Sequence, residues 1–289
     1  SNLANALLGK GAIVVGLRTR AGNNEKTSEK ITKNPNFCCQ NIGESPDIFL
    51  AENAAIKNIT ACFHFAGIAN AVECQNNPRL AYRSNVDLTF QVLEFCRLAG
   101  IKKFIYPSTG YVYGGHLEQP ADETYPLVST NIYTATKIAA EALIESYAFF
   151  HGFDCTIGRL SNVYGGKSNL ETVTGIVIEN VIKGKPISLK TLRPIRDFIF
   201  INDVIGGFLT FLETKSDQTC SYYNISTGIG TSIKTLAETA CEVANCSKKN
   251  IITPKKDSFL GTKIVLNPEK FKTDLNWEPA YSIKDGLSK

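Results

Sequence analysis

The stretch SNLANALLGKGAIVVGLRTR at residues 1–20 decides the fold, because it sets a helix directly before a buried strand. Leucines recur at helical spacing within Leu3–Leu8, and two glycines then end that pattern. The run Ala12–Leu17 that follows is apolar throughout. A strand that is apolar on both faces is typical of a parallel sheet covered by helices on each side.

The same alternation of helix and strand continues along most of the chain. Five further apolar, β-branched or aromatic runs are predicted to be strands: Phe37–Asn41, Ala61–Ala66, Lys103–Ser108, Phe153–Leu160 and Tyr222–Ile225. Helical patterns separate them at Asp47–Lys57, Asn85–Ala99 and Tyr133–His151. This alternation predicts an α/β fold with a doubly wound parallel sheet.

The regular alternation of helices and strands ends after residue 165. A predicted helix at Thr174–Lys183 leads into a loop with glycine and proline, and the last part of the chain mixes short elements with prolines. We therefore predict a main domain over residues 1–165, which the chain rejoins at about 197–225. A smaller, mixed C-terminal lobe takes residues 166–196 and 226–289.

The composition narrows the classes of partner. The net charge is +4 without a basic block, the apolar runs are far shorter than a membrane span, and no signal-peptide pattern opens the chain. Nine cysteines are scattered without a Cys-x-x-Cys pair. We expect a cytoplasmic protein with free thiols, no nucleic-acid or membrane partner and no metal site.

Polar residues follow the predicted strand at 103–108, at the sheet edge where open α/β proteins bind ligands. Ser108 and Thr109 come first, although a turn rich in small polar residues explains them equally well. Further on, NIYTATK at 131–137 begins a helix and sets Tyr133 and Lys137 one turn apart. This Tyr-x-x-x-Lys pair is weak as a motif on its own, because chance alone produces about one in such a chain.

The chemistry of hydride transfer explains why such a pair matters. Oxidising an alcohol requires a base for the hydroxyl proton, and a free tyrosine, with a pKa of about 10, is a poor base at neutral pH. A nearby ammonium favours the phenolate. We predict that Tyr133 is this base, that Lys137 activates it and holds a cofactor ribose, and that Thr109, with Ser108 beside it, donates a hydrogen bond to the substrate oxygen.

A series of segments resembles the extended short-chain dehydrogenase/reductases, and within them the nucleotide-sugar epimerase/dehydratase group. The segments are HFAG at 64–67, NVDLTFQVLEFC at 85–96, PSTGYVYG at 107–114, YTATK at 133–137, GRLSNVYGG at 158–166, RDFIFINDV at 196–204, YNISTG at 223–228 and LNWEPAYSIKDGL at 275–287. The resemblance implies a Rossmann-type dinucleotide-binding main domain, a substrate-binding lobe, an NAD or NADP cofactor, and a nucleotide-diphosphate sugar as substrate.

The resemblance also bears on the first residues. In the family, the helix at Leu3–Leu8 follows a short strand and a turn G-x-x-G-x-x-G, whose backbone amides hold the cofactor pyrophosphate. Neither precedes the helix in this sequence, which also contains no methionine. We expect a sequence that starts after these elements, and a relative that has lost cofactor binding is the alternative.

One position bears on the choice between NAD and NADP. NAD enzymes of this fold carry an acidic residue after their second strand to hold the ribose 2′-hydroxyl. The run Ala12–Leu17 corresponds to that second strand, and Arg18 follows it in this sequence. A guanidinium suits a 2′-phosphate, so the residue favours NADP, and a solvated surface arginine is the alternative. The other cofactor contacts that the resemblance implies are Asn41, Ile42, Phe65, Ala66, Gly67, Asn85, Tyr133 and Lys137.

Asn162 and Arg196, together with Thr109, are the substrate contacts that the resemblance implies. A guanidinium at Arg196 suits a diphosphate, and a salt bridge to Asp197 or Asp203 is the alternative. Three other polar positions are interpreted as structural. We expect His64 to pack in the core, Arg159 to be structural, and the loop with Asp122 and Glu123 to be solvated.

The reaction itself stays open among three functions. Dehydratases of this family carry acidic residues directly after the threonine, and Gly110 and Tyr111 stand there in this sequence, which is unfavourable for 4,6-dehydration. We predict a nucleotide-sugar epimerase, with an NADPH-dependent 4-keto-sugar reductase as the alternative. A non-catalytic nucleotide-sugar-binding regulator is the alternative of another class. The helices at 85–99 and 133–151 resemble those that form the family's dimer interface, so we also expect a homodimer.

Overall fold

Strands and helices alternate along the chain in the computed structural model, which describes residues 2–19, 34–42, 58–115, 119–166, 172–214, 220–253 and 261–289. The fold is the predicted α/β fold with a parallel sheet. The chain divides into two units. The first contains Ser1–Tyr106, Ala139–Thr156 and Phe211–Ser221, and the second contains Pro107–Ile138, Ile157–Thr210 and Tyr222–Lys289.

The main sheet has four strands in the order β3-β4-β5-β9. These strands are β3 (Ala61–Phe63), β4 (Lys103–Thr109), β5 (Asp154–Leu160) and β9 (Cys220–Ile225). β3 and β4 pair in parallel, and the side chains of β4 and β5 are buried along nearly their whole length. Their apolar sequences are therefore explained by burial on both faces.

A second parallel pair contains two of the predicted strands. β1 (Val14–Thr19) follows helix α1 (Asn2–Gly9) and pairs with β2 (Phe37–Ile42), so that Arg18 lies opposite Asn41. The side chains of Arg18, Asn41 and Ile42 lie outside the described part of the structure. The helix predicted at 47–57 also lies outside it.

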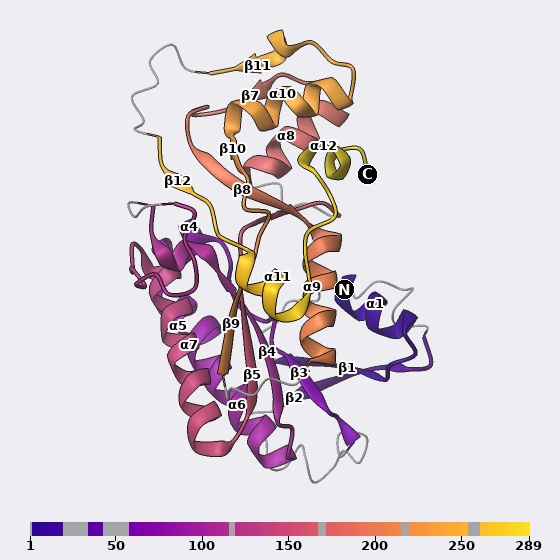
Figure 1. The fold of residues 1–289 in the computed structure, drawn as a ribbon, viewed down its shortest axis with the longest axis vertical. Coiled ribbons are helices and arrows are strands. Elements are labelled where there is room, and N and C mark those ends of the chain that lie inside the picture. The colour runs from indigo at the N-terminus through magenta and orange to yellow at the C-terminus, as the bar shows by residue number, and fades with distance from the viewer. Residues whose placement is uncertain are drawn as a thin grey trace. The chain divides into compact units, whose positions relative to one another are not determined.

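The helices that follow β3 are α4 (Ala71–Asn76), α5 (Pro78–Tyr82), the π-helix η2 (Arg83–Asp87) and α6 (Leu88–Ala99). The single helix predicted at 85–99 thus begins as a π-helical turn. α6 lies beside the long helix α7 (Ile132–His151), which Figure 1 labels. The two helices are joined by the Tyr147 hydroxyl, which donates to Glu94 Oε1 at 2.6 Å. The predicted boundaries of α7 are correct to within one residue.

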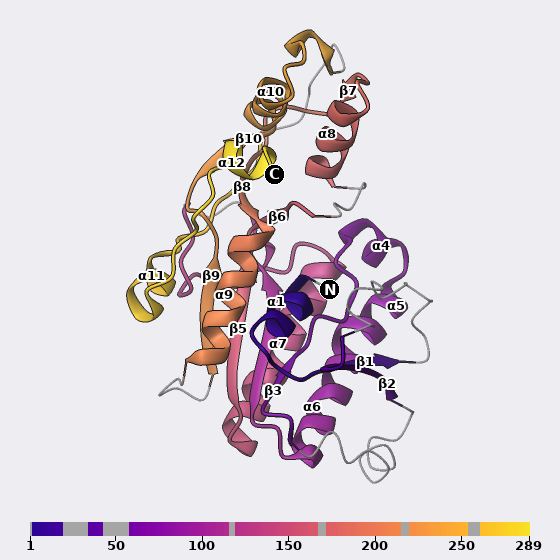
Figure 2. The same cartoon turned by 90° about the vertical axis from the view of Figure 1, so that its right-hand side faces the viewer.

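The second unit contains a mixed sheet in which β8 (Ile195–Phe200) lies between β10 (Gly230–Ser232) and β12 (Lys263–Ile264), with β6 (Asn162–Tyr164) also paired to β8. β7 (Ile187–Ser188) pairs in parallel with β11 (Ile251–Ile252). Figure 2 shows β7 next to helix α8 (Val173–Ile182). The remaining elements are η3 (Gly110–Tyr113), α8 (Val173–Ile182), α9 (Ile201–Glu213), α10 (Ile233–Val243), η4 (Lys248–Asn250), α11 (Glu269–Leu275) and α12 (Ile283–Leu287).

Three further findings concern the helices, the cysteines and the core of the described structure. None of its helices is both long enough and apolar enough to cross a membrane. Among the described residues, Cys62, Cys96, Cys155, Cys241 and Cys246 are free thiols, as predicted for them. The core of the second unit is formed by apolar side chains from β8, α8 and α10, among them Phe198, Val177 and Leu236.

Candidate functional site

The first turn of α7 carries the predicted base and is held by a reciprocal cap. The side chain of Asn131 accepts the backbone N–H of Thr134 at 3.0 Å, and Thr134 Oγ1 accepts the backbone N–H of Asn131 at 3.1 Å. Such a cap satisfies amides that the helix leaves unbonded. The helix start is therefore fixed just before Tyr133, and Lys137 lies on the same helical face one turn later.

Lys137 connects this helix to the carboxyl end of β4. Its ammonium donates a hydrogen bond to the carbonyl oxygen of Pro107 at 2.7 Å. Pro107 directly precedes Ser108 and Thr109. The structure thus brings Lys137 to the strand end that carries the two predicted hydroxyls, at the sheet edge where α/β proteins bind ligands.

The two hydroxyls of this strand end have hydrogen-bonding capacity to spare. Ser108 is 3% exposed, and its Oγ atom has no hydrogen-bond partner among the described residues. Thr109 is 5% exposed, and its Oγ1 accepts the backbone N–H of Tyr111 at 3.3 Å. A buried hydroxyl without a partner costs about 1–3 kcal/mol. Such a cost in a folded protein calls for a functional explanation, and a bound ligand provides one.

The predicted substrate contacts meet at a third hydroxyl. The phenolic oxygen of Tyr111 accepts hydrogen bonds from Asn162 Nδ2 and from Arg196 Nε, each at 3.3 Å. The guanidinium of Arg196 donates further bonds of 2.8 Å to the Ile195 carbonyl and to the carbonyl and hydroxyl of Thr262. The role of Tyr111 at this point of the structure was not predicted from the sequence. Its place two residues beyond Thr109, just after the strand, was the available signal.

The alternative partners of Arg196 have other roles. The carboxylate of Asp197 accepts the backbone amides of Thr227 and Gly228 and the Thr227 hydroxyl. That of Asp203 accepts the amides at positions 280 and 281. Burial raises the pKa of both carboxyls. Within the described structure, Arg196 therefore forms no salt bridge with either of them.

The turn after β3 brings together four predicted cofactor contacts. The side chain of Asn85 binds both backbone groups of Ile68: its Oδ1 accepts the Ile68 N–H at 2.7 Å and its Nδ2 donates to the Ile68 carbonyl at 3.0 Å. This pair of bonds closes the turn that contains Phe65, Ala66 and Gly67. β3 ends at Phe63 and not at residue 66 as predicted, because the chain turns here.

Gly67 is required by the geometry of this turn. Its φ is +148°, and a Cβ atom there would lie 2.7 Å from Asn85 Oδ1. All three residues of the 65–67 turn are exposed, and a glycine without a side chain lets a ligand approach the backbone closely. The turn therefore fits one side of a dinucleotide, and the residues at 65–67 are the ones that would hold it.

A buried histidine supports the same turn from behind. Thr89 Oγ1 donates to the backbone carbonyl of Asn85 at 2.7 Å and lies 3.0 Å from His64 Nε2. Because the Thr89 hydrogen is used on the carbonyl, we infer that His64 donates from Nε2. His64 is 3% exposed and its ring stacks on that of Tyr106. His64 is thus packed in the core, as predicted.

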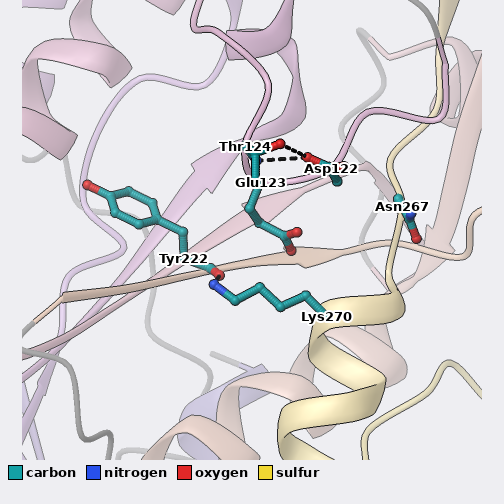
Figure 3. A pocket seen from close by; sticks show the side chains of 6 residues that line it. All are labelled: Asp122, Glu123, Thr124, Tyr222, Asn267 and Lys270. Atoms are coloured by element: carbon teal, nitrogen blue, oxygen red, sulfur yellow. Dashed lines mark hydrogen bonds between the residues drawn. The ribbon is translucent and has the colours of Figure 1, made fainter.

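A separate pocket of about 360 Å³ lies beside the loop at 121–126 (Figure 3). It is lined by Asp122, Glu123, Thr124, Tyr222, Asn267 and Lys270. The expectation of a solvated loop is wrong for Glu123, because its Oε1 accepts the amide of Asn224 at 2.6 Å and burial raises its pKa. The nearby Arg159 is 4% exposed, and its guanidinium lies 5.0 Å from the Tyr113 ring and 4.6 Å from the Tyr222 ring, a structural role as predicted.

The residue that follows Thr109 has no room for a side chain. A Cβ atom at Gly110 would lie 2.6 and 2.7 Å from the two methyl carbons of Leu266. Leu266 is fully buried and packs against Val112, Tyr113 and Ala121. Any larger residue at 110 would therefore force this cluster to repack.

Comparison with known proteins identifies the family. The sequence profile described as the NAD dependent epimerase/dehydratase family matches residues 1–226. The chain belongs to this family. The match confirms the resemblance seen in the sequence, the enzyme class, and a nicotinamide cofactor at the level of NAD or NADP.

Relatives within the epimerase/dehydratase family include proteins of both names. A putative UDP-glucose 4-epimerase of Methanocaldococcus jannaschii is 27% identical over 245 residues, which cover 83% of this chain and 78% of the relative. A dTDP-D-glucose 4,6-dehydratase of Bos taurus is 31% identical over 71% of this chain and 59% of its own length. A UDP-glucose 4-epimerase structure from Thermotoga maritima with UDP-glucose, 25% identical, covers 99% of this chain and 92% of its own, with a TM-score of 0.86.

Proposed function

We propose that this protein is a nucleotide-sugar epimerase, in which Tyr133 removes and returns the proton of a sugar hydroxyl. The observation that carries the proposal is the bond from Lys137 Nζ to the Pro107 carbonyl. It holds the helix of the Tyr-x-x-x-Lys pair against a strand end whose buried hydroxyls at Ser108 and Thr109 have spare donor capacity.

The residues of the chain divide the chemistry among them. A nicotinamide cofactor, held on one side by the turn at 65–67 that Asn85 closes, would supply reversible hydride transfer to and from the sugar. Tyr133 takes the hydroxyl proton at its phenolic oxygen, and the ammonium of Lys137 favours the phenolate form that makes this possible. Thr109 donates its hydrogen to the same sugar oxygen, since its bond with the Tyr111 amide uses only a lone pair and leaves the hydrogen available. Inversion follows when the ketone turns over and receives the hydride on its other face.

A nucleotide-diphosphate sugar is the proposed substrate. The Thermotoga maritima relative was solved with UDP-glucose, and the archaeal relative is named for the same substrate. In this chain, Asn162 and Arg196 lie together at the Tyr111 hydroxyl. A guanidinium and an amide side by side suit the oxygens of a diphosphate.

The environment of Gly110 supports epimerisation over dehydration, although dehydratases are also among the relatives. In dehydratases of this family, acidic residues follow the threonine directly. A side chain at 110 would collide with the buried Leu266, and position 111 holds a tyrosine. The chain therefore lacks the acid pair that water elimination uses.

Arg18 favours a second candidate, a 4-keto-sugar reductase. A single net reduction suits a cofactor that binds as NADPH and leaves oxidised, and a guanidinium at the end of β1 suits the 2′-phosphate. An epimerase instead keeps its cofactor through the whole cycle. The cofactor that accompanies the purified protein therefore distinguishes the two.

The test measures bound cofactor and turnover on the same preparation of full-length protein. We expect tightly held NAD or NADP, identified by mass spectrometry after denaturation, and interconversion of UDP-glucose and UDP-galactose or of their dTDP counterparts. Tyr133→Phe should lower kcat by about 10³-fold or more, because the base is lost. The control Tyr223→Phe, which removes a hydroxyl bonded to Asp274, should keep activity.

Three other outcomes contradict the epimerase. An empty protein that oxidises NADPH with a 4-keto nucleotide sugar is a reductase. Binding of cofactor and nucleotide sugar without any turnover identifies the regulator. Unchanged turnover in Tyr133→Phe removes the proposed base, whichever reaction is found.

The homodimer is a further part of the proposal. α6 and α7 contact each other and carry large exposed aromatic side chains, with Phe90 at 45%, Phe149 at 74% and Phe150 at 76% exposure. Exposed apolar groups gathered on paired helices are typical of an interface. Sedimentation equilibrium should give twice the mass of one chain, and Phe150→Glu should shift the mass toward that of the monomer. A monomeric wild-type protein would contradict the interface.

A further inference from the structure

The hydroxyl of Tyr111 is held by two donors and has its own hydrogen to give. A phenol oxygen carries one hydrogen and accepts through its lone pairs. Asn162 Nδ2 and Arg196 Nε can only donate, so both of their bonds to Tyr111 use these lone pairs. Within the described residues, the Tyr111 hydrogen is therefore not used in either bond.

Arg196 uses most of its N–H groups within the protein and keeps one for a ligand. Of its five N–H groups, one binds Tyr111, two on Nη1 bind the carbonyls of Ile195 and Thr262, and one on Nη2 binds the Thr262 hydroxyl. A single N–H of Nη2 remains. The guanidinium thus fixes the Tyr111 hydroxyl, and it offers its positive charge and this one N–H group to a diphosphate.

Two residues shortly before Tyr111, Ser108 and Thr109, also have a hydroxyl hydrogen that is not used among the described residues. Thr109 Oγ1 accepts the Tyr111 amide and keeps its hydrogen, and the 97%-buried Ser108 Oγ has no partner among the described residues. Three of the four residues from 108 to 111 therefore offer a hydroxyl hydrogen. Such a series of donors suits a ligand that is rich in oxygen acceptors.

We propose that Tyr111 is a ligand-binding residue, whose hydroxyl donates its hydrogen to an oxygen of the nucleotide sugar. This inference rests on the proposed function, because it takes the ligand from it. The acceptor is an oxygen either of the diphosphate or of the sugar. Asn162 and Arg196 hold the phenol in place, so the hydrogen is presented without a loss of side-chain freedom on binding.

The experiment compares Tyr111→Phe with wild type in binding and in kinetics. Isothermal titration with UDP-glucose should show a Kd that rises roughly three- to ten-fold, the usual effect of losing one hydrogen bond to a ligand. KM should rise by the same factor while kcat changes by less than about two-fold, because the bond is made in both ground and transition states. Tyr223→Phe, which also loses a hydroxyl bonded within the protein, is the matched control and should bind as wild type.

Titration with UDP alone locates the acceptor. If Tyr111→Phe weakens UDP and UDP-glucose alike, the acceptor is a diphosphate oxygen. If only UDP-glucose is weakened, it is an oxygen of the sugar. Both outcomes support the proposal. The same titrations with dTDP and dTDP-glucose replace them if the wild-type protein prefers that base.

Three results overturn the proposal, and they can be told apart. If the wild-type protein turns over nucleotide sugars and Tyr111→Phe binds UDP and UDP-glucose unchanged, Tyr111 has no ligand role and the proposed function stands. A fall in kcat and melting temperature without a change in either Kd means a structural role and also overturns it. If the wild-type protein binds none of the four nucleotides, the proposed function fails and this inference fails with it.

Discussion

Asn85 and the hydroxyls of residues 108–111 are polar groups that use their hydrogen bonds in opposite ways. The side-chain amide of Asn85 binds the backbone of Ile68: its oxygen accepts one hydrogen bond and its nitrogen donates another. Among the described residues, the hydroxyls of Thr109 and Tyr111 only accept hydrogen bonds, and that of Ser108 has no partner. Burial alone therefore does not separate a positioning group from a binding group, whereas the use of its donors does.

The largest effect expected from this difference is on turnover in Thr109→Val. Valine has the shape of threonine without the hydroxyl, so the change removes the hydrogen that is proposed to reach the sugar oxygen. We expect kcat to fall about 10²-fold, as for other donors that stabilise a reacting oxygen. The free energy of unfolding should change by less than about 1 kcal/mol, because only the weak 3.3 Å cap of the Tyr111 amide is lost.

Thr89→Val is the matched control, since it makes the same change in a hydroxyl that the protein uses itself. Thr89 donates to the Asn85 carbonyl and contacts His64 Nε2, so its loss should cost about 1–3 kcal/mol in unfolding free energy. Turnover per folded molecule should stay near that of wild type. Hydroxyls that donate within the protein are proposed to differ from hydroxyls that donate to a ligand. This distinction would be wrong if Thr89→Val lost turnover as Thr109→Val does, or if Thr109→Val kept it.

The sequence predicted those parts of the site that rest on local pattern. The period of the helix sets Tyr133 and Lys137 on one face, and the apolar run before Ser108 places the strand end. The alternation of elements was sufficient for the α/β fold. These features depend on neighbours along the chain, and a single sequence contains that information.

The remaining features depend on contacts between distant residues. Nothing near Tyr111 in the sequence indicates that Asn162 and Arg196, 51 and 85 positions away, bind its hydroxyl. The π-helical turn at Asn85 could not be predicted either, because the same residues also fit a regular helix. Its tether to Ile68 became visible only in the structure.

Two arginines near strands show the same limit. Arg159 lies in β5, and its guanidinium lies close to the rings of Tyr113 and Tyr222. Arg196 lies in β8 and holds Tyr111 instead. Both side chains belong to strands and both contact a tyrosine, so their residue types alone do not separate a structural from a ligand-side role. Arg196 differs from Arg159 in that the tyrosine it binds, Tyr111, has a hydroxyl hydrogen that neither of its two described hydrogen bonds uses.

The smallest expected effect concerns Glu94, a partly exposed carboxylate whose hydrogen bonds are made within the protein. Glu94 accepts hydrogen bonds from Arg97 and from the Tyr147 hydroxyl, and these bonds lower its pKa to about 2. Because the pKa is lower in the folded state than in the unfolded chain, the ionised group stabilises the fold above its ordinary pKa of 4.5. This contribution should disappear as the pH falls from about 5 toward 2.

Glu94→Gln measures this contribution, because glutamine still accepts the Tyr147 hydrogen but carries no charge for Arg97. Since the pair is partly exposed, we expect a loss of only about 0.5 kcal/mol in unfolding free energy at neutral pH. Urea unfolding at a series of pH values should show the difference between wild type and variant shrinking as Glu94 becomes protonated, with kcat unchanged. A difference that stays constant down to pH 2 would mean that the carboxylate acts by shape and not by charge, and a lower kcat would mean that Glu94 also affects the active site.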